Sequence, residues 1–148
     1  MRLDRGWIIA HVPHQGAMCL LDEVIDWDAH SITCLARNHM SLAHPLRWRD
    51  RLPVTAGIEY AAQGMAVHGA LLGGARGQTG YLASVRNVRF HVERLDDAGA
   101  ELEIRCQRLH GEASSVLYAF TLRAGEIALL EGRAAVVLDA SAFANRLS

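Results

Sequence analysis

The chain has 148 residues, the size of one ordinary domain, so a single domain spanning 1–148 is expected. Apolar residues make up 51% and charged residues 21%, which excludes a disordered chain. A formal net charge of -1 without like-charge runs argues against nucleic-acid binding, and no apolar stretch approaches the roughly 20 residues of a membrane span. The first residues precede no long apolar run, so we expect no signal peptide and a cytoplasmic protein.

Two strands are predicted before the middle of the chain, over 20–27 and 31–37, and a long helix follows over 53–72. Pro53 suits the first helical turn, where its missing N–H is not needed, and Gly73-Gly74 stops the helix. The helix is poor in charge and apolar on nearly every side. That pattern is typical of a helix surrounded by other structure.

Four further strands are predicted over 81–92, 100–109, 115–122 and 127–138, separated by turn-forming residues. The second of them alternates apolar and polar residues, the pattern of a half-buried antiparallel strand. The order of elements predicts an α+β fold in which one antiparallel sheet wraps around one long central helix.

The cysteines and histidines do not form a metal-binding or disulfide pattern. The three cysteines are scattered and odd in number, so we expect buried thiols in a reducing compartment: Cys19, Cys34 and Cys106. No two of the eight histidines have the spacing that places two ligands on one helix face, so no metal site is expected.

Three motifs follow one another in the sequence. The opening reads Val-Pro-His-Gln-Gly-Ala-Met-Cys-Leu-Leu-Asp-Glu-Val over 12–24, the helix carries Pro53-x5-Glu59-x3-Gln63, and 81–90 reads Tyr-Leu-Ala-Ser-Val-Arg-Asn-Val-Arg-Phe. Together these resemble the hotdog-fold 3-hydroxyacyl-acyl carrier protein dehydratases of fatty acid synthesis, over roughly residues 8–138.

The chain departs from the usual pattern of that family at one place. The family's catalytic histidine lies in a Gly-His-Phe-Pro-Gly run before the helix, whereas residues 43–48 read Ala-His-Pro-Leu-Arg-Trp. Counting back from Glu59 places Pro45 at the histidine's position, with His44 beside it, and Val54 replaces the helix-start glycine. The chain is therefore more similar to the divergent dehydratases of aryl polyene clusters, which keep the Pro-His opening and the helix glutamate.

The resemblance implies dehydration of a 3-hydroxyacyl thioester on an acyl carrier protein or CoA, with Glu59 and either His14 or His44 as catalytic residues. A histidine suits removal of the α-proton, and a shielded carboxyl group can protonate the leaving hydroxyl. Gln63, one turn after Glu59, can bind Glu59 or substrate, or be satisfied by the backbone. Four apolar residues are candidates for the acyl-binding surface, or else core residues: Met18, Trp48, Ile58 and Phe90.

The resemblance also implies no cofactor beyond the substrate's phosphopantetheine arm, and a homodimer or a heterodimer with another hotdog subunit. Four arginines could form a basic patch for the carrier's acidic surface: Arg47, Arg49, Arg51 and Arg76. His68 falls on nearly the opposite helix face from Glu59 and is expected to pack. The remaining histidines are expected at strand ends or in solvent: His11, His30, His39, His91 and His110.

Two alternative functions remain open at this point. A hotdog thioesterase would use a helix carboxylate at a similar place to hydrolyse the acyl thioester. A non-catalytic hotdog subunit, suggested by the missing Gly-His-Phe-Pro-Gly run, would complete the site of a partner. The Pro13-His14 opening favours the dehydratase over the thioesterase.

Overall fold

A computed structural model describes residues 2–12, 16–73, 80–112 and 114–138. At the N-terminus, strand β1 (Leu3–Asp4) leads into helix α1 (Arg5–His11), and a short 3-10 helix, η1 (Gly16–Met18), follows. The Asp4 side chain accepts a hydrogen bond from the Trp7 backbone N–H at 2.9 Å and so caps α1. The sequence analysis predicted none of these N-terminal elements.

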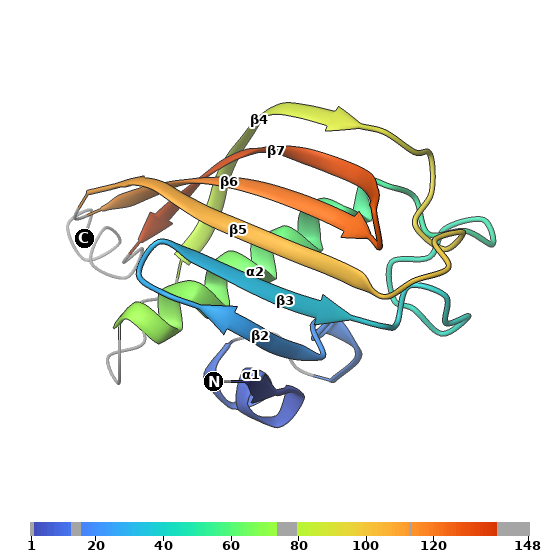
Figure 1. Ribbon diagram of the computed structural model, residues 1–148, viewed down its shortest axis with the longest axis horizontal. Coiled ribbons are helices and arrows are strands. Elements are labelled where there is room, and N and C mark those ends of the chain that lie inside the picture. The colour runs from blue at the N-terminus through green and yellow to red at the C-terminus, as the bar shows by residue number, and fades with distance from the viewer. Residues whose placement is uncertain (1, 13–15, 74–79, 113, 139–148) are drawn as a thin grey trace, which may run out of the picture.

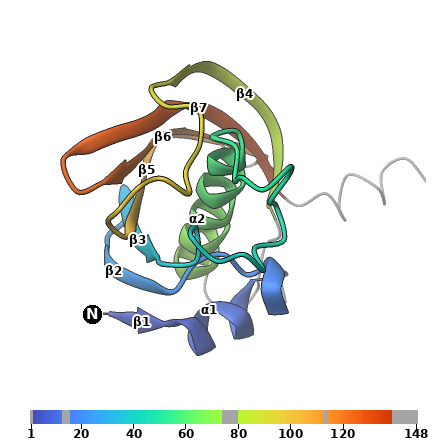
Figure 2. The same cartoon turned by 90° about the vertical axis from the view of Figure 1, so that its right-hand side faces the viewer.

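Within the described residues, the sheet has seven antiparallel strands in the order β1-β2-β3-β5-β6-β7-β4. Its strands after β1 are β2 (Glu23–Trp27), β3 (Ser31–Ala36), β4 (Gly80–Phe90), β5 (Leu102–Gly111), β6 (Ser115–Ala124) and β7 (Ile127–Leu138). Although β4 and β5 are consecutive in the chain, β6 and β7 lie between them in the sheet. The segment after β4 therefore crosses one end of the sheet to reach β5 (Figures 1 and 2).

Alternation along the strands decides which side chains meet the core. In β5, Leu102, Ile104 and Cys106 are fully buried, whereas Glu103 and Arg105 are exposed. In β6, every second residue from 116 to 124 is buried in the same way. One face of the sheet therefore carries the apolar core, as period-two alternation predicts.

Helix α2 (Ala56–Gly73) lies in the hollow of the curved sheet, and the strands wrap around it (Figures 1 and 2). Glycines allow this close approach: a Cβ at Gly57 would lie 2.5 Å from Leu130 Cδ2, and one at Gly64 would lie 3.0 Å from Cys106 Sγ. The prediction of one antiparallel sheet wrapped around one long helix is confirmed.

The predicted strands are all present, with small shifts at their ends, but the predicted helix start was wrong. Pro53 forms an isolated β-bridge with Arg94, and the Val54 N–H donates to the Glu93 carbonyl at 3.0 Å, so the helix begins only at Ala56. The largest strand shift is at β2, predicted from residue 20 and observed from Glu23.

The three cysteines are free and buried, as predicted. Burial raises the pKa of each thiol, to about 12 for Cys34. No helix among the described residues is long and apolar enough to cross a membrane.

Candidate active site

Glu59 is the acidic residue in the first turn of α2. Its neighbours Gly57, Tyr60 and Ala61 are buried, whereas Glu59 itself is only partly buried. Gly57 packs against Leu130 of β7, and Glu59 follows two residues later, about 200° around the helix. The carboxylate is therefore turned away from that part of the sheet.

Gln63 connects Glu59 to the segment that follows the Pro-His opening. Its side chain is buried (1% exposed), and its Nε2 donates to both Glu59 Oε1 at 3.2 Å and the Met18 carbonyl at 2.7 Å. Its Oε1 accepts from the Leu20 N–H at 2.8 Å. The Gln63 amide therefore holds Glu59, the candidate catalytic glutamate, in a fixed position relative to the backbone of residues 18–20. Of the three possibilities raised for Gln63, binding of Glu59 and binding of the backbone are both observed, and binding of substrate stays a prediction.

Arg5 holds the same segment from its other side. Its Nη1 donates to the Cys19 carbonyl at 2.6 Å and its Nη2 to the Gly16 carbonyl at 2.9 Å. The sequence analysis did not single out Arg5, because α1 was not predicted. His14, a candidate base, lies outside the described residues, but the backbone from Gly16 to Leu20 is anchored by Arg5 and Gln63.

His44, the other candidate base, is turned into the core. It is 6% exposed, and its Nε2 lies 2.8 Å from the hydroxyl of Tyr60, which in turn donates to Asn38 Oδ1 at 2.6 Å. The Leu46 N–H donates to His44 Nδ1 at 3.1 Å, so Nδ1 is an acceptor and Nε2 carries the proton toward Tyr60. Both ring nitrogens are engaged, and burial lowers the pKa of the imidazole. This arrangement suits a structural link between the loop and α2 better than a base.

Two further histidines are buried. His68 packs as predicted, and its Nδ1 lies 2.7 Å from the Tyr118 hydroxyl while its Nε2 donates to the Asp28 carbonyl at 2.8 Å. His39 was expected at a strand end or in solvent. It lies in the turn that follows β3 but is fully buried, and its Nε2 donates to the Ala98 carbonyl at 3.0 Å, which ties this turn to the segment after β4.

The four candidate acyl-binding residues lie on different elements. Ile58 is on α2, partly buried against the core. Met18 in η1, Trp48 in the loop before α2 and Phe90 at the end of β4 are 40%, 60% and 45% exposed. Their assignment to the acyl-binding surface stays a prediction.

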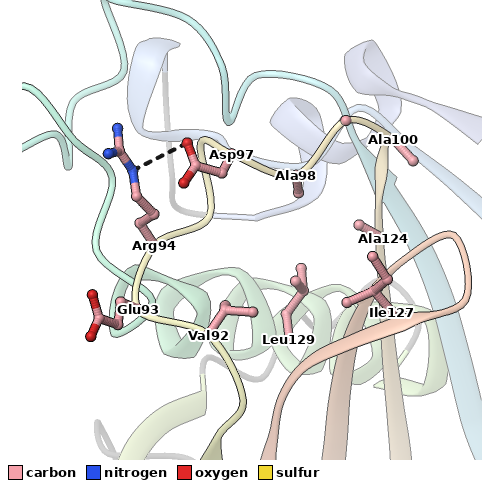
Figure 3. Close-up of a pocket in the computed structure, with 10 residues that line it drawn as sticks. Val92, Glu93, Arg94, Asp97, Ala98, Ala100, Ala124, Ile127 and Leu129 are labelled. Atoms are coloured by element: carbon pink, nitrogen blue, oxygen red, sulfur yellow. Dashed lines mark ion pairs between the residues drawn. The ribbon is translucent and has the colours of Figure 1, made fainter.

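Among the cavities in the described part of the chain are two that none of those four residues lines. The larger, about 550 Å³, lies between the segment after β4 and the β6–β7 hairpin (Figure 3). Its wall is mostly apolar, including Val92, Ile127 and Leu129, with the Arg94–Asp97 ion pair (3.4 Å) at its edge. The smaller, about 320 Å³, lies on β4, β6 and β7. Within the described residues, no three His, Cys, Asp or Glu side chains are grouped to hold a metal ion.

The family comparison shows which reaction class the chain belongs to. The ApeP-like family, described as ApeP dehydratase, matches residues 7–145. The chain belongs to the ApeP-like dehydratase family. The predicted relationship to divergent hotdog dehydratases of the aryl polyene type is thereby confirmed, and so is dehydration as the reaction. No curated protein sequence matches the chain.

Solved structures confirm the hotdog fold. The dehydratase heterocomplex ApeI:P from Xenorhabdus doucetiae has a TM-score of 0.78 at 22% identity, with 88% of this chain and 90% of that chain covered. A thioesterase from Haemophilus influenzae has a TM-score of 0.60 at 10% identity, covering 88% of this chain and 80% of its own. PaaI from E. coli has a TM-score of 0.58 at 12% identity, covering 77% and 80%. The likeness of this ApeP-like chain to the thioesterase is one of fold.

Proposed function

We propose that this ApeP-like dehydratase removes water from a 3-hydroxyacyl thioester on the phosphopantetheine arm of an acyl carrier protein, giving the 2-enoyl thioester. The observation that carries the site assignment is the Gln63 amide, which bonds Glu59 and the backbone of Met18 and Leu20 at once. That contact joins the helix glutamate to residues 18–20, which follow the Pro13-His14 opening in the sequence. The opening and the helix glutamate both belong to the motifs that resemble the dehydratases.

In the proposed reaction, His14 takes the α-proton and Glu59, as the acid, gives a proton to the β-hydroxyl. The C–O bond breaks, water leaves and the α,β double bond forms. Transfer of a proton from the histidine to the glutamate restores the starting state, so the reaction needs no redox cofactor or metal. His44 acts as a positioning residue, because its Nε2 bonds Tyr60, which follows Glu59 in the first helical turns.

We further propose that a second hotdog subunit completes the site. β4 forms one edge of the sheet and exposes Leu82 (39%) and Phe90 (45%), so its backbone and these apolar side chains are available to a partner. The similar ApeP-containing structure is a heterocomplex, which favours a heterodimer over a homodimer. The free cysteines support a reducing compartment, the cytoplasm.

The test follows water loss and free-thiol release by mass spectrometry on carrier-bound 3-hydroxyacyl substrates. It uses the protein alone and mixed with a second hotdog dehydratase subunit. Glu59→Gln should abolish water loss, whereas Glu103→Gln, an exposed residue of β5, should not affect it. Thiol release without water loss, or silence with and without the second subunit, would overturn the proposal.

A further inference from the structure

Residues 48–51 form a tight turn immediately before α2. The Trp48 N–H donates to the Arg51 carbonyl at 2.8 Å, and the Arg51 N–H donates back to the Trp48 carbonyl at 3.2 Å. The two residues between them, Arg49 and Asp50, both have positive φ, at 50° and 64°. Two-residue turns of this kind normally use Asn-Gly or Asp-Gly, because a Cβ disfavours the left-handed region. Here the two central residues are an arginine and an aspartate.

The surrounding structure holds this unfavourable conformation in place. Arg47 Nη2 donates to the Asp50 carbonyl at 2.7 Å, and its Nη1 lies 3.8 Å from Asp96 Oδ2. Asp96 Oδ1 accepts from the Leu52 N–H at 3.1 Å, on the other side of the turn. Strained backbone persists only where neighbours fix it, and such strain is concentrated at binding sites and active sites.

The turn presents to solvent one aromatic ring, the guanidinium groups of Arg49 and Arg51, and the carboxylate of Asp50 between them, so its exposed side chains carry two positive charges and one negative charge. Trp48 is 60% exposed, and Arg49 Cζ lies 4.4 Å from the centroid of its ring. Arg51 is also exposed, and within the described residues neither Arg49 nor Arg51 forms an ion pair. Of the four arginines expected to form a basic patch, Arg47 instead contacts the Asp50 carbonyl and Asp96, and Arg76 lies outside the described residues.

The turn lies at the end of the molecule where α2 begins, beyond the right-hand ends of β3 and β5 in Figure 1. The chain from Arg51 to Ala56, the first residue of α2, can span at most about 18 Å. A protein bound at residues 48–51 is therefore near the first turn of α2, which carries Glu59. This is the region that the flexible phosphopantetheine arm of a carrier protein would sample.

We propose that the Trp48–Arg51 turn is a docking point for the acidic surface of the acyl carrier protein; this rests on the function proposed above. Arg49 and Arg51 pair with carboxylates of the carrier, and the indole of Trp48 packs against an apolar side chain between them. Tryptophan and arginine are the residue types that dominate binding energy at protein interfaces. Because the turn is already fixed, little conformational freedom is lost on binding.

The experiment compares two substrates that carry the same 3-hydroxyacyl group, one on a carrier protein and one on free pantetheine. Arg49→Glu/Arg51→Glu should raise KM for the carrier-bound substrate by about tenfold or more, and Trp48→Ala by about tenfold. For the pantetheine thioester, kcat/KM of the Arg49→Glu/Arg51→Glu variant should stay within about twofold of wild type, because no docking surface is involved. The control is Arg105→Glu/Arg133→Glu, which makes the same charge change on exposed strand positions.

Titration calorimetry of holo-carrier protein separates failure of docking from failure of the proposed function. If the wild type binds the carrier but dehydrates neither substrate, the proposed function is refuted. The docking proposal is then tested by comparing the carrier affinity of the wild type with that of the variants. Equal affinity of the wild type and the Arg49→Glu/Arg51→Glu variant, or no binding by either, would overturn the docking proposal. So would equal losses on both substrates. Dissociation of the Trp48→Ala oligomer would assign the turn to a subunit interface instead.

Discussion

Replacing Gln63 with leucine tests the arrangement on which the proposed site depends. The substitution keeps a buried side chain of similar size but removes the three hydrogen bonds to Leu20, Met18 and Glu59. Each backbone bond contributes about 1 kcal/mol, and the bond to the carboxylate contributes about 1 kcal/mol more after allowance for solvent around Glu59. We expect Gln63→Leu to lower the free energy of unfolding by about 3 kcal/mol. For a chain of this length, that is a fall in Tm of about 6–12 °C.

Turnover should fall in the same variant even well below its Tm. Without the amide, the Glu59 carboxylate and the Met18–Leu20 backbone are no longer held together, and a displacement of about 1 Å at an active site can cost up to about a hundredfold in rate. We expect kcat for dehydration to fall at least about tenfold. Thermal unfolding is monitored by circular dichroism. Steady-state dehydration is measured about 20 °C below the variant's Tm.

Gln107→Leu is the matched control, because Gln107 is exposed on β5 and the chemical change is the same. Its free energy of unfolding should change by no more than about 0.5 kcal/mol. A Gln63→Leu protein with the Tm and kcat of the control would refute the reasoning, since the three bonds would then hold neither the fold nor the site.

Two further predictions concern the packing of α2. Burial lowers the pKa of His44 and His68, so the unfolded chain takes up these protons at higher pH than the folded protein does. Stability should therefore be complete above about pH 6.5 and fall as the pH drops below it, and a urea midpoint equal at pH 7.5 and 5.5 would contradict this. Gly57→Ala places a Cβ against Leu130 and should cost about 1–3 kcal/mol. Gly69→Ala meets nothing within 4 Å and should stabilise by up to about 1 kcal/mol, so equal melting temperatures of the two variants would argue against this close packing.

Much of this protein follows from local pattern. Alternation in residues 102–106 predicts a half-buried strand, and the charge-poor run after Pro53 predicts a helix enclosed by the sheet. Both are observed, because period and polarity report which face of an element is buried. The Pro53-x5-Glu59-x3-Gln63 motif carried part of the resemblance to the dehydratases, since the spacing of a motif can be recognised without knowing which residues it contacts.

Only the tertiary structure decided which side chains meet. The amide of Gln63 reaches residues 43 and 45 positions earlier in the chain, and His44 bonds Tyr60, 16 positions later. No periodicity within one element records such distant pairs. The same holds for the helix start, which pairing of Pro53 with Arg94 moved to Ala56, and for the left-handed turn fixed by Arg47. Hydrogen-bond partners depend on how elements pack, whereas the apolar face of an element, the one available for burial, can be recognised from its own sequence.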